Sequence, residues 1–232
     1  MPTFEEIYAA HAAAYDRLVA REDYQGNILA ALRAIRPLEG IDVIEMGAGT
    51  GRLTRLLAPI VGSIRAFDRS AHMLGVAGSH LAASGLSNWS LHVADHDALP
   101  AASASADLAI EGWSFGHVTE WQADRWQQAA DAALAEMQRV LRPGGTAVLL
   151  ETMGTAVTEP VPPHQTLADF YAWLADERGF QMVVIRTDYR FESLQEAVEL
   201  AGFFFGPEMA ARIERHGWDI VPEWTGVWWK RK

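Results

Sequence analysis

The stretch Val43-Ile-Glu-Met-Gly-Ala-Gly-Thr-Gly-Arg52 decides the fold of this chain. A short apolar run carries one acid, Glu45, and leads into glycines at the alternate positions Gly47, Gly49 and Gly51, after which a helical pattern begins. Glycine permits tight turns and lets a ligand approach the backbone closely. A glycine-rich turn at the carboxyl end of a first strand is where doubly wound sheets bind nucleotide-like ligands. The stretch therefore predicts an α/β fold with a ligand loop after its first strand.

The rest of the chain alternates short apolar runs with helical patterns, which is typical of a mainly parallel sheet covered by helices. We expect strands at residues 41–46, 63–67, 89–94, 107–110, 146–150, 181–189 and 224–229, and helices at 4–19, 25–36, 51–58, 70–84, 124–141, 166–177, 193–204 and 207–216. The apolar runs are far shorter than the roughly 20 residues that span a bilayer. The first residues lack the basic and apolar regions of a signal peptide. These patterns favour a soluble, cytoplasmic protein of one domain.

The charge balance narrows the class of partner. The 232 residues include 19 Lys and Arg against 30 Asp and Glu, which gives a formal net charge of −11. Nucleic acids and anionic lipids require a basic face, so we expect neither as a partner, and a neutral or cationic small molecule fits better. The chain has no cysteine, which excludes disulfides, Cys-ligated metal sites and thiol nucleophiles. His92 and Asp95 point to opposite faces of their expected strand, so we expect no metal site.

Two acids and the glycine spacing indicate which nucleotide the loop binds. The dinucleotide fingerprint is GxGxxG, which cradles a pyrophosphate at a helix N-terminus, whereas this chain has GxGxG followed by Arg52. The carboxylate of Glu45 would repel a diphosphate and suits a cationic ligand. Asp68 ends the second strand, roughly 20 residues beyond the glycines, where an acid accepts hydrogen bonds from ribose hydroxyls. The combination predicts a ribose without a diphosphate, and it disfavours the alternative of an NAD(P)-binding oxidoreductase.

The same residues resemble the motifs of class I S-adenosylmethionine-dependent methyltransferases, and the resemblance runs over most of the chain. Tyr15-Asp16 resembles an aromatic–acid pair in the N-terminal helix of the small-molecule branch, and the segment 187–229 resembles an uncharacterised subgroup. The family implies a Rossmann-like α/β fold with a seven-stranded, mostly parallel sheet, an antiparallel last strand and an N-terminal helical cap. The other segments that carry the resemblance are 66–74, 93–100, 107–114 and the turn Leu141-Arg-Pro-Gly-Gly.

The resemblance also implies the cofactor and the residues that hold it. It implies a single methyltransferase domain over residues 1–232, with a helical cap at 1–37, a cofactor-binding core at 38–154, and substrate-side helices with the last two strands at 155–232. The cofactor is S-adenosylmethionine and its product is S-adenosylhomocysteine. Asp68 is expected to hold the ribose, and Asp95 the adenine amino group. The residues expected to bind the cofactor are Tyr15, Glu45, Gly47, Ala48, Gly49, Gly51, Asp68, Arg69, Met73, Asp95, His96, Glu111, Gly112 and Trp113.

The implied reaction is in-line transfer of a methyl group to an oxygen, nitrogen or carbon atom of a small molecule. His117 is the candidate catalytic base because imidazole titrates near neutral pH; a hydrogen-bonded loop histidine is the other interpretation. A non-catalytic relative that binds the cofactor or a partner protein stays open as an alternative. A nucleic-acid amino-methyltransferase would carry an acidic or amide residue, two prolines and an aromatic residue where this chain has Glu111-Gly-Trp-Ser. We expect a monomer or a homodimer.

Overall fold

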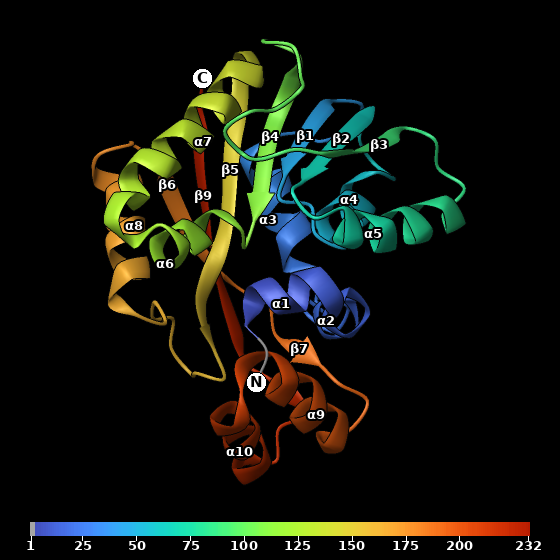
Figure 1. The fold of residues 1–232 in the computed structure, drawn as a ribbon, viewed down its shortest axis with the longest axis vertical. Coiled ribbons are helices and arrows are strands. Elements are labelled where there is room, and N and C mark those ends of the chain that lie inside the picture. The colour runs from blue at the N-terminus through green and yellow to red at the C-terminus, as the bar shows by residue number, and fades with distance from the viewer. Residues whose placement is uncertain (1–2) are drawn as a thin grey trace.

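The glycine-rich stretch lies in the middle of a seven-stranded sheet in the computed structural model, which describes residues 3–232 (Figure 1). Strands β1 to β5 pair in parallel, and β9 runs antiparallel to both of its neighbours. The expected seven-stranded sheet with an antiparallel last strand is therefore confirmed. In spatial order the strands are β3 (Trp89–Val93), β2 (Ser63–Asp68), β1 (Asp42–Met46), β4 (Ala106–Gly112), β5 (Leu141–Thr155), β9 (Glu223–Arg231) and β6 (Gln181–Arg186).

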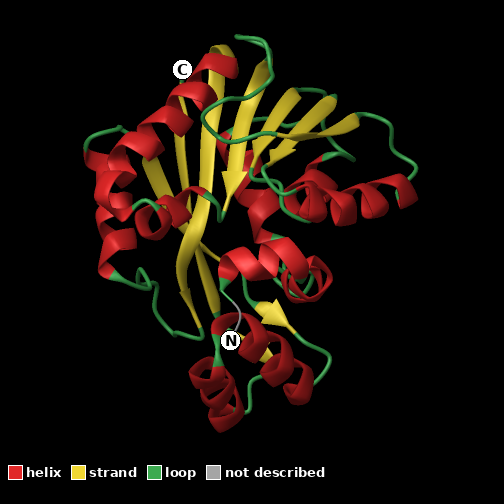
Figure 2. Cartoon of the chain, in the orientation of Figure 1, coloured by secondary structure: helices red, strands yellow, loops and turns green. Residues whose placement is uncertain are grey.

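Helices cover both faces of this sheet (Figure 2). Successive strand residues point to opposite faces, so Ile44 packs in one buried cluster with α7 (Trp126–Val140) and α8 (Gln165–Asp176). Its neighbour Val43 packs in a second cluster with α3 (Asn27–Ile35) and α4 (Arg52–Leu57). Helix α5 (Ala71–Ala83) lies beside α4 and packs through Leu74 against Ala66 of β2. The apolar runs on both faces make β1 and β4 the centre of the core.

The N-terminal segment forms two helices, so the expected single helix over 4–19 is wrong. Helix α1 (Phe4–Ala10) starts with a capping box between Thr3 and Glu6, and α2 (Ala12–Val19) starts after a turn at His11. Ile7 and Ala12 are both fully buried. Residues five apart do not share one face of a straight helix, and the turn at His11 brings both inward. The two helices lie across the edge at which the parallel strands end, which we call the carboxyl edge (Figure 1).

The C-terminal part also builds on the carboxyl edge. Helices α9 (Leu194–Phe205) and α10 (Pro207–His216) pack on each other and carry a small sheet of β7 (Tyr189–Arg190) and β8 (Ile220–Val221). The expected strand over 181–189 is therefore wrong beyond residue 186. The backbone N–H of Thr187 donates to Glu223 O, and the Asp188 carboxylate accepts from Glu223 N. These bonds turn the chain out of the main sheet before β7 begins.

Strand β5 is longer than the expected 146–150. It continues to Thr155 because β9 pairs with it beyond the sheet proper, through Thr152 opposite Thr225 and Thr155 opposite Glu223. This extension carries Glu151 past the carboxyl edge. Between β4 and α7 lie three short helical turns, η1 (Phe115–His117), α6 (Val118–Trp121) and η2 (Ala123–Arg125).

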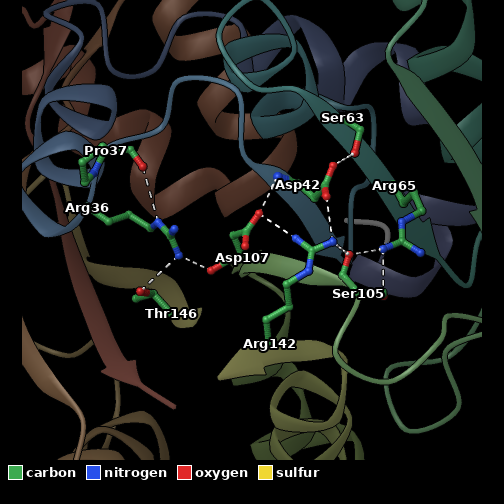
Figure 3. Close-up of polar contacts among 9 residues, drawn as sticks. All are labelled: Arg36, Pro37, Asp42, Ser63, Arg65, Ser105, Asp107, Arg142 and Thr146. Atoms are coloured by element: carbon green, nitrogen blue, oxygen red, sulfur yellow. Dashed lines mark hydrogen bonds and ion pairs between the residues drawn. The ribbon is translucent and has the colours of Figure 1, made fainter. Parts of the chain in front are cut away.

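The opposite edge, where the parallel strands begin, carries a network of paired polar groups (Figure 3). Arg142 donates to the carboxylates of Asp42 and Asp107, at 2.8 Å each, and Ser63 Oγ donates to Asp42 at 2.6 Å. Arg36 donates to the backbone carbonyl of Asp107. These bonds join the starts of β1, β2, β4 and β5. Within residues 3–232 no helix is long and apolar enough to cross a membrane.

Candidate functional site

The glycine loop after β1 has backbone angles that favour glycine. Gly47, Gly49 and Gly51 all have positive φ, at 76°, 53° and 78°. The N–H groups of Gly47 and Ala48 donate to the carbonyl of Phe67, at 2.8 and 2.9 Å, which ties the loop to the end of β2. A Cβ atom at position 47 would lie 2.4 Å from Ser114 Oγ. The loop therefore needs glycine both for its conformation and for the close approach of the turn after β4.

Asp68 stands at the end of β2 and is held by two backbone donors. Its Oδ2 accepts from Gly49 N at 2.8 Å, and its Oδ1 accepts from Ser70 N at 2.7 Å. Burial raises the pKa of Asp68, and the two N–H donors oppose that shift. The carboxylate is fixed in orientation and lines a cavity next to the glycine loop.

This first cavity has a volume of about 350 Å³ and lies at the carboxyl edge of β1, β2 and β4. Such a volume is in the range of small-ligand sites. The structure brings nine of the predicted cofactor residues to its wall: Tyr15, Gly47, Gly49, Asp68, Arg69, Met73, His96, Gly112 and Trp113. Tyr8, Ala9, Ser70, Ser114, His117 and Trp121 complete the lining.

The remaining five predicted cofactor residues do not line the first cavity. Ala48 is buried within the loop, and Gly51 is the N-cap of α4. Glu45 is buried and accepts a hydrogen bond from Thr54 of α4, so it links the loop to that helix. Burial raises the pKa of Glu45 to about 8. Asp95 is exposed beside the cavity.

The fifth of these residues, Glu111, fixes the turn after β4. Its Oε2 accepts from Ser114 N, Ser114 Oγ and Phe115 N, at 3.1, 2.9 and 3.2 Å. Burial raises the pKa of Glu111 to about 8. Within this turn Trp113 has a φ of 55°, a left-handed backbone conformation that residues other than glycine rarely adopt. Strained backbone of this kind clusters at ligand sites, and Trp113 lines the first cavity.

His117 follows this turn and is held among aromatic rings. Its Nε2 lies 3.1 Å from the Tyr8 hydroxyl, and its ring stacks on Trp121 with centroids 4.4 Å apart. Burial lowers the pKa of His117 to about 4, so the imidazole is neutral at neutral pH. Burial likewise lowers the pKa of His96 to about 4. A neutral imidazole at a cavity wall can accept a proton.

A second cavity of about 580 Å³ adjoins the first. Tyr8, Tyr15, Trp113 and His117 line both, so these four side chains form the boundary between them. The second cavity extends under α1 and α2 toward the extension of β5, the segment 157–164, and α9 and α10. Phe4, Leu18, Val157, Leu167, Phe204, Phe205 and Met209 make most of its wall apolar.

The sequence analysis missed several residues of the second cavity. Glu22, Arg52, Tyr189 and Glu223 line it and come from four separate segments of the chain. The sequence analysis gave none of them a role, although Arg52 ends the glycine stretch and Tyr189 and Glu223 lie within residues 187–229, because only the long-range packing brings them together. Within the described residues no three His, Cys, Asp or Glu side chains are grouped as a metal site requires.

Comparisons with known proteins show which sequences and folds this chain resembles. The model of the methyltransferase domain family matches residues 43–145. A malonyl-[acyl-carrier protein] O-methyltransferase of Methylococcus capsulatus is 32% identical over 64% of this chain, and the match covers half of that relative's length. A ubiquinone/menaquinone biosynthesis C-methyltransferase of a Caulobacter species is 26% identical over 82% of each chain.

The fold also has counterparts among solved structures. An S-adenosylmethionine-dependent methyltransferase from Aquifex aeolicus superposes with a TM-score of 0.57 at 16% identity and covers 86% of both chains. That similarity concerns the fold, while the match to the family model runs from β1 to the start of β5. Residues 43–145 therefore match the methyltransferase domain family, and the fold is that of S-adenosylmethionine-dependent methyltransferases.

Proposed function

We propose that this protein transfers a methyl group from S-adenosylmethionine in the first cavity to an oxygen, nitrogen or carbon atom of a small molecule in the second. One observation carries the proposal: the two cavities share the boundary of Tyr8, Tyr15, Trp113 and His117. A donor and an acceptor held on either side would meet there. Holding two reactants in contact and away from water supplies much of the rate enhancement in such a transfer.

The first cavity fits the cofactor through its donor and acceptor groups. Asp68 presents a fixed carboxylate for the ribose hydroxyls, and Met73 offers an apolar surface for the adenine. His96 lines the cavity while Asp95 is exposed beside it, so in this proposal His96 contacts the adenine edge. The backbone of Gly47 and Gly112 borders the remaining space, where the methionine part would lie.

The chemistry that the cofactor supplies is a methyl group already activated on a sulfonium. The protein then has to orient the acceptor, exclude water and accept a proton where the acceptor carries one. We assign the last task to His117, which is neutral at pH 7 and lies at the shared boundary. Its bond with the Tyr8 hydroxyl orients the ring.

The proposal divides the chain into a helical cap, a cofactor-binding core and substrate-side helices, within one domain. A cytoplasmic location and a monomeric or homodimeric state remain predictions from the sequence. So does the expectation that neither nucleic acid nor a membrane is a partner.

Isothermal titration calorimetry with S-adenosylhomocysteine, beside NAD and NADP, tests the cofactor class. Hydrogen bonds to a charged group contribute about 1.5–3 kcal/mol. Asp68→Asn should therefore weaken the binding of S-adenosylhomocysteine about 10- to 150-fold. Asp176→Asn, an exposed aspartate on α8, is the matched control and should leave the affinity unchanged. Binding of NAD instead would refute the proposal. Binding of S-adenosylhomocysteine without methyl transfer to any acceptor in a tritiated-methyl screen would favour the non-catalytic alternative.

A further inference from the structure

The second cavity is lined by several buried carboxyl groups although most of its wall is apolar. The side chains of Glu22, Glu151 and Glu223 line it and are only 2–3% exposed. Arg52 is the one buried cation among its described lining residues, and it is already paired with Glu22 at 2.6 Å. His164, at the outer rim, lies 3.4 Å from the exposed Glu120. The inner end of the cavity therefore has three carboxyl groups against one arginine.

Several polar atoms at this inner end lack a hydrogen-bond partner. Glu22 Oε2 pairs with Arg52, but its Oε1 is unpartnered. Glu223 Oε1 accepts from Thr152 Oγ1 at 2.9 Å, while its Oε2 is buried without a partner. Buried polar atoms are nearly always hydrogen-bonded in native proteins, and an unmade bond costs stability. Two carboxyl groups that line one cavity therefore each keep an oxygen without a donor, which points to a ligand that carries hydrogen-bond donors.

Arg52 does not offer an equivalent anchor for an anion. Its guanidinium carbon lies 4.1 Å from the centre of the Trp113 ring, so one face of the group is covered. Its Nη2 atom is unpartnered, but its charge is balanced by Glu22. A carboxylate placed beside Arg52 would also lie beside the carboxylate of Glu22, where like charges repel.

We propose that the acceptor molecule is an apolar amine, whose ammonium group binds between Glu22 and Glu223 while its apolar body lies along Phe204, Phe205 and Met209. This inference rests on the proposed function, because it takes the second cavity as the acceptor site. The ammonium group supplies the hydrogen-bond donors that the unpartnered carboxylate oxygens lack. Charge-assisted bonds of this kind are stronger than bonds between neutral groups.

A pH dependence of binding follows from the surroundings of Glu223. Burial and the charge of Glu22 together raise the pKa of Glu223 to about 8, against the opposing effects of the bond from Thr152, the nearby Thr155 hydroxyl and the charge of Arg52. Tyr171, Tyr189 and Asp188 are the other titratable groups that face this carboxyl. A bound ammonium favours the ionised form, so Glu223 should release its proton to solvent. Affinity should therefore rise between pH 6 and 8, where an alkylamine stays protonated.

Three probes with one ring system and different head groups test the inference: tryptamine, tryptophol and indole-3-propionate. We expect calorimetry to show tryptamine binding at least tenfold more tightly than tryptophol, with indole-3-propionate the weakest. Tryptamine binding should release protons, which titrations in phosphate and in Tris detect by their different ionisation heats. Glu223→Gln should abolish the preference for tryptamine, whereas Glu214→Gln, at an exposed position of α10 outside the cavity lining, should preserve it.

Equal or tighter binding of indole-3-propionate would overturn the inference and point to a lining arginine, Arg52 or Arg212, as the anchor. Equal binding of tryptophol, or no binding of any probe, would also overturn it. If Glu223→Gln fails to fold, the ranking of the three probes and its pH dependence on the unmodified chain decide the question. Each titration is made with and without S-adenosylhomocysteine. A chain that prefers tryptamine but does not bind S-adenosylhomocysteine would refute the proposed function and leave the amine site standing.

Discussion

Replacement of Gly47 by alanine tests whether the glycine loop is shaped by contact with the turn after β4. The new methyl group would lie 2.4 Å from Ser114 Oγ and 2.6 Å from Ser114 Cβ, with His96 Nε2 at 3.1 Å. The left-handed conformation costs a residue other than glycine about 1 kcal/mol, and overpacking of this kind costs about 2 kcal/mol. The sum of about 3 kcal/mol corresponds to a fall in melting temperature of about 6–12 °C for a chain of this length.

Gly40→Ala is the matched control for this experiment. Gly40 has nearly the same φ, 73° against 76°, but no atom lies within 4 Å of the position that its new methyl group would take. The melting temperature of Gly40→Ala should therefore fall by only about 2–4 °C, which is the cost of the left-handed conformation alone. Thermal unfolding followed by circular dichroism gives both values, and calorimetry should show weaker S-adenosylhomocysteine binding for Gly47→Ala alone. Equal losses in the two variants would refute the steric argument. A second change, Ser114→Gly, removes both close atoms and should restore part of the stability of Gly47→Ala.

Two further predictions concern charge. The pKa of Glu45 is raised by burial to about 8, so the folded chain holds this proton more tightly than the unfolded chain, and stability falls as pH rises from about 4.5 to 8. Urea unfolding should show that, between pH 5.5 and 7.5, the free energy of unfolding of the unmodified chain falls by about 2–3 kcal/mol relative to that of Glu45→Gln. If the difference in unfolding free energy between the two chains stays constant over this range, the raised pKa of Glu45 is wrong. Arg142→Met breaks the contacts with Asp42 and Asp107 in Figure 3. This substitution should lower the melting temperature without changing the affinity for S-adenosylhomocysteine, because the network lies at the edge of the sheet opposite the glycine loop. A changed affinity would show that the two edges are coupled.

The sequence was sufficient to predict the core of the fold because the decisive signals there are local. An apolar run, a glycine turn and an acid after the next run lie within residues 43–68, and parallel strands bring their carboxyl ends to one edge without further information. The position of Asp68 beside Gly49 follows from that rule. The break at His11 has no such signal, since alanines surround it and favour an unbroken helix. It arises from packing against the rest of the chain.

The second cavity was beyond sequence reasoning for a related reason. Glu22 follows α2, Arg52 begins α4, Tyr189 starts β7 and Glu223 starts β9, so their separation along the chain hides their contact in space. Each taken alone resembles an ordinary surface residue. That these residues form a ligand site becomes apparent only when their burial, their ion pair and their unpartnered atoms are considered together.

The two edges of the sheet show how one fold separates stability from binding. At the starting edge Arg142 donates hydrogen bonds to both Asp42 and Asp107, so these charged groups are paired. At the carboxyl edge the chain keeps a strained Trp113 and the unpartnered oxygens of Glu22 and Glu223. Such features lower stability unless something compensates for them. A ligand stabilises the folded chain more the more tightly it binds. We infer that ligand binding at the carboxyl edge compensates for these strained and unpartnered groups.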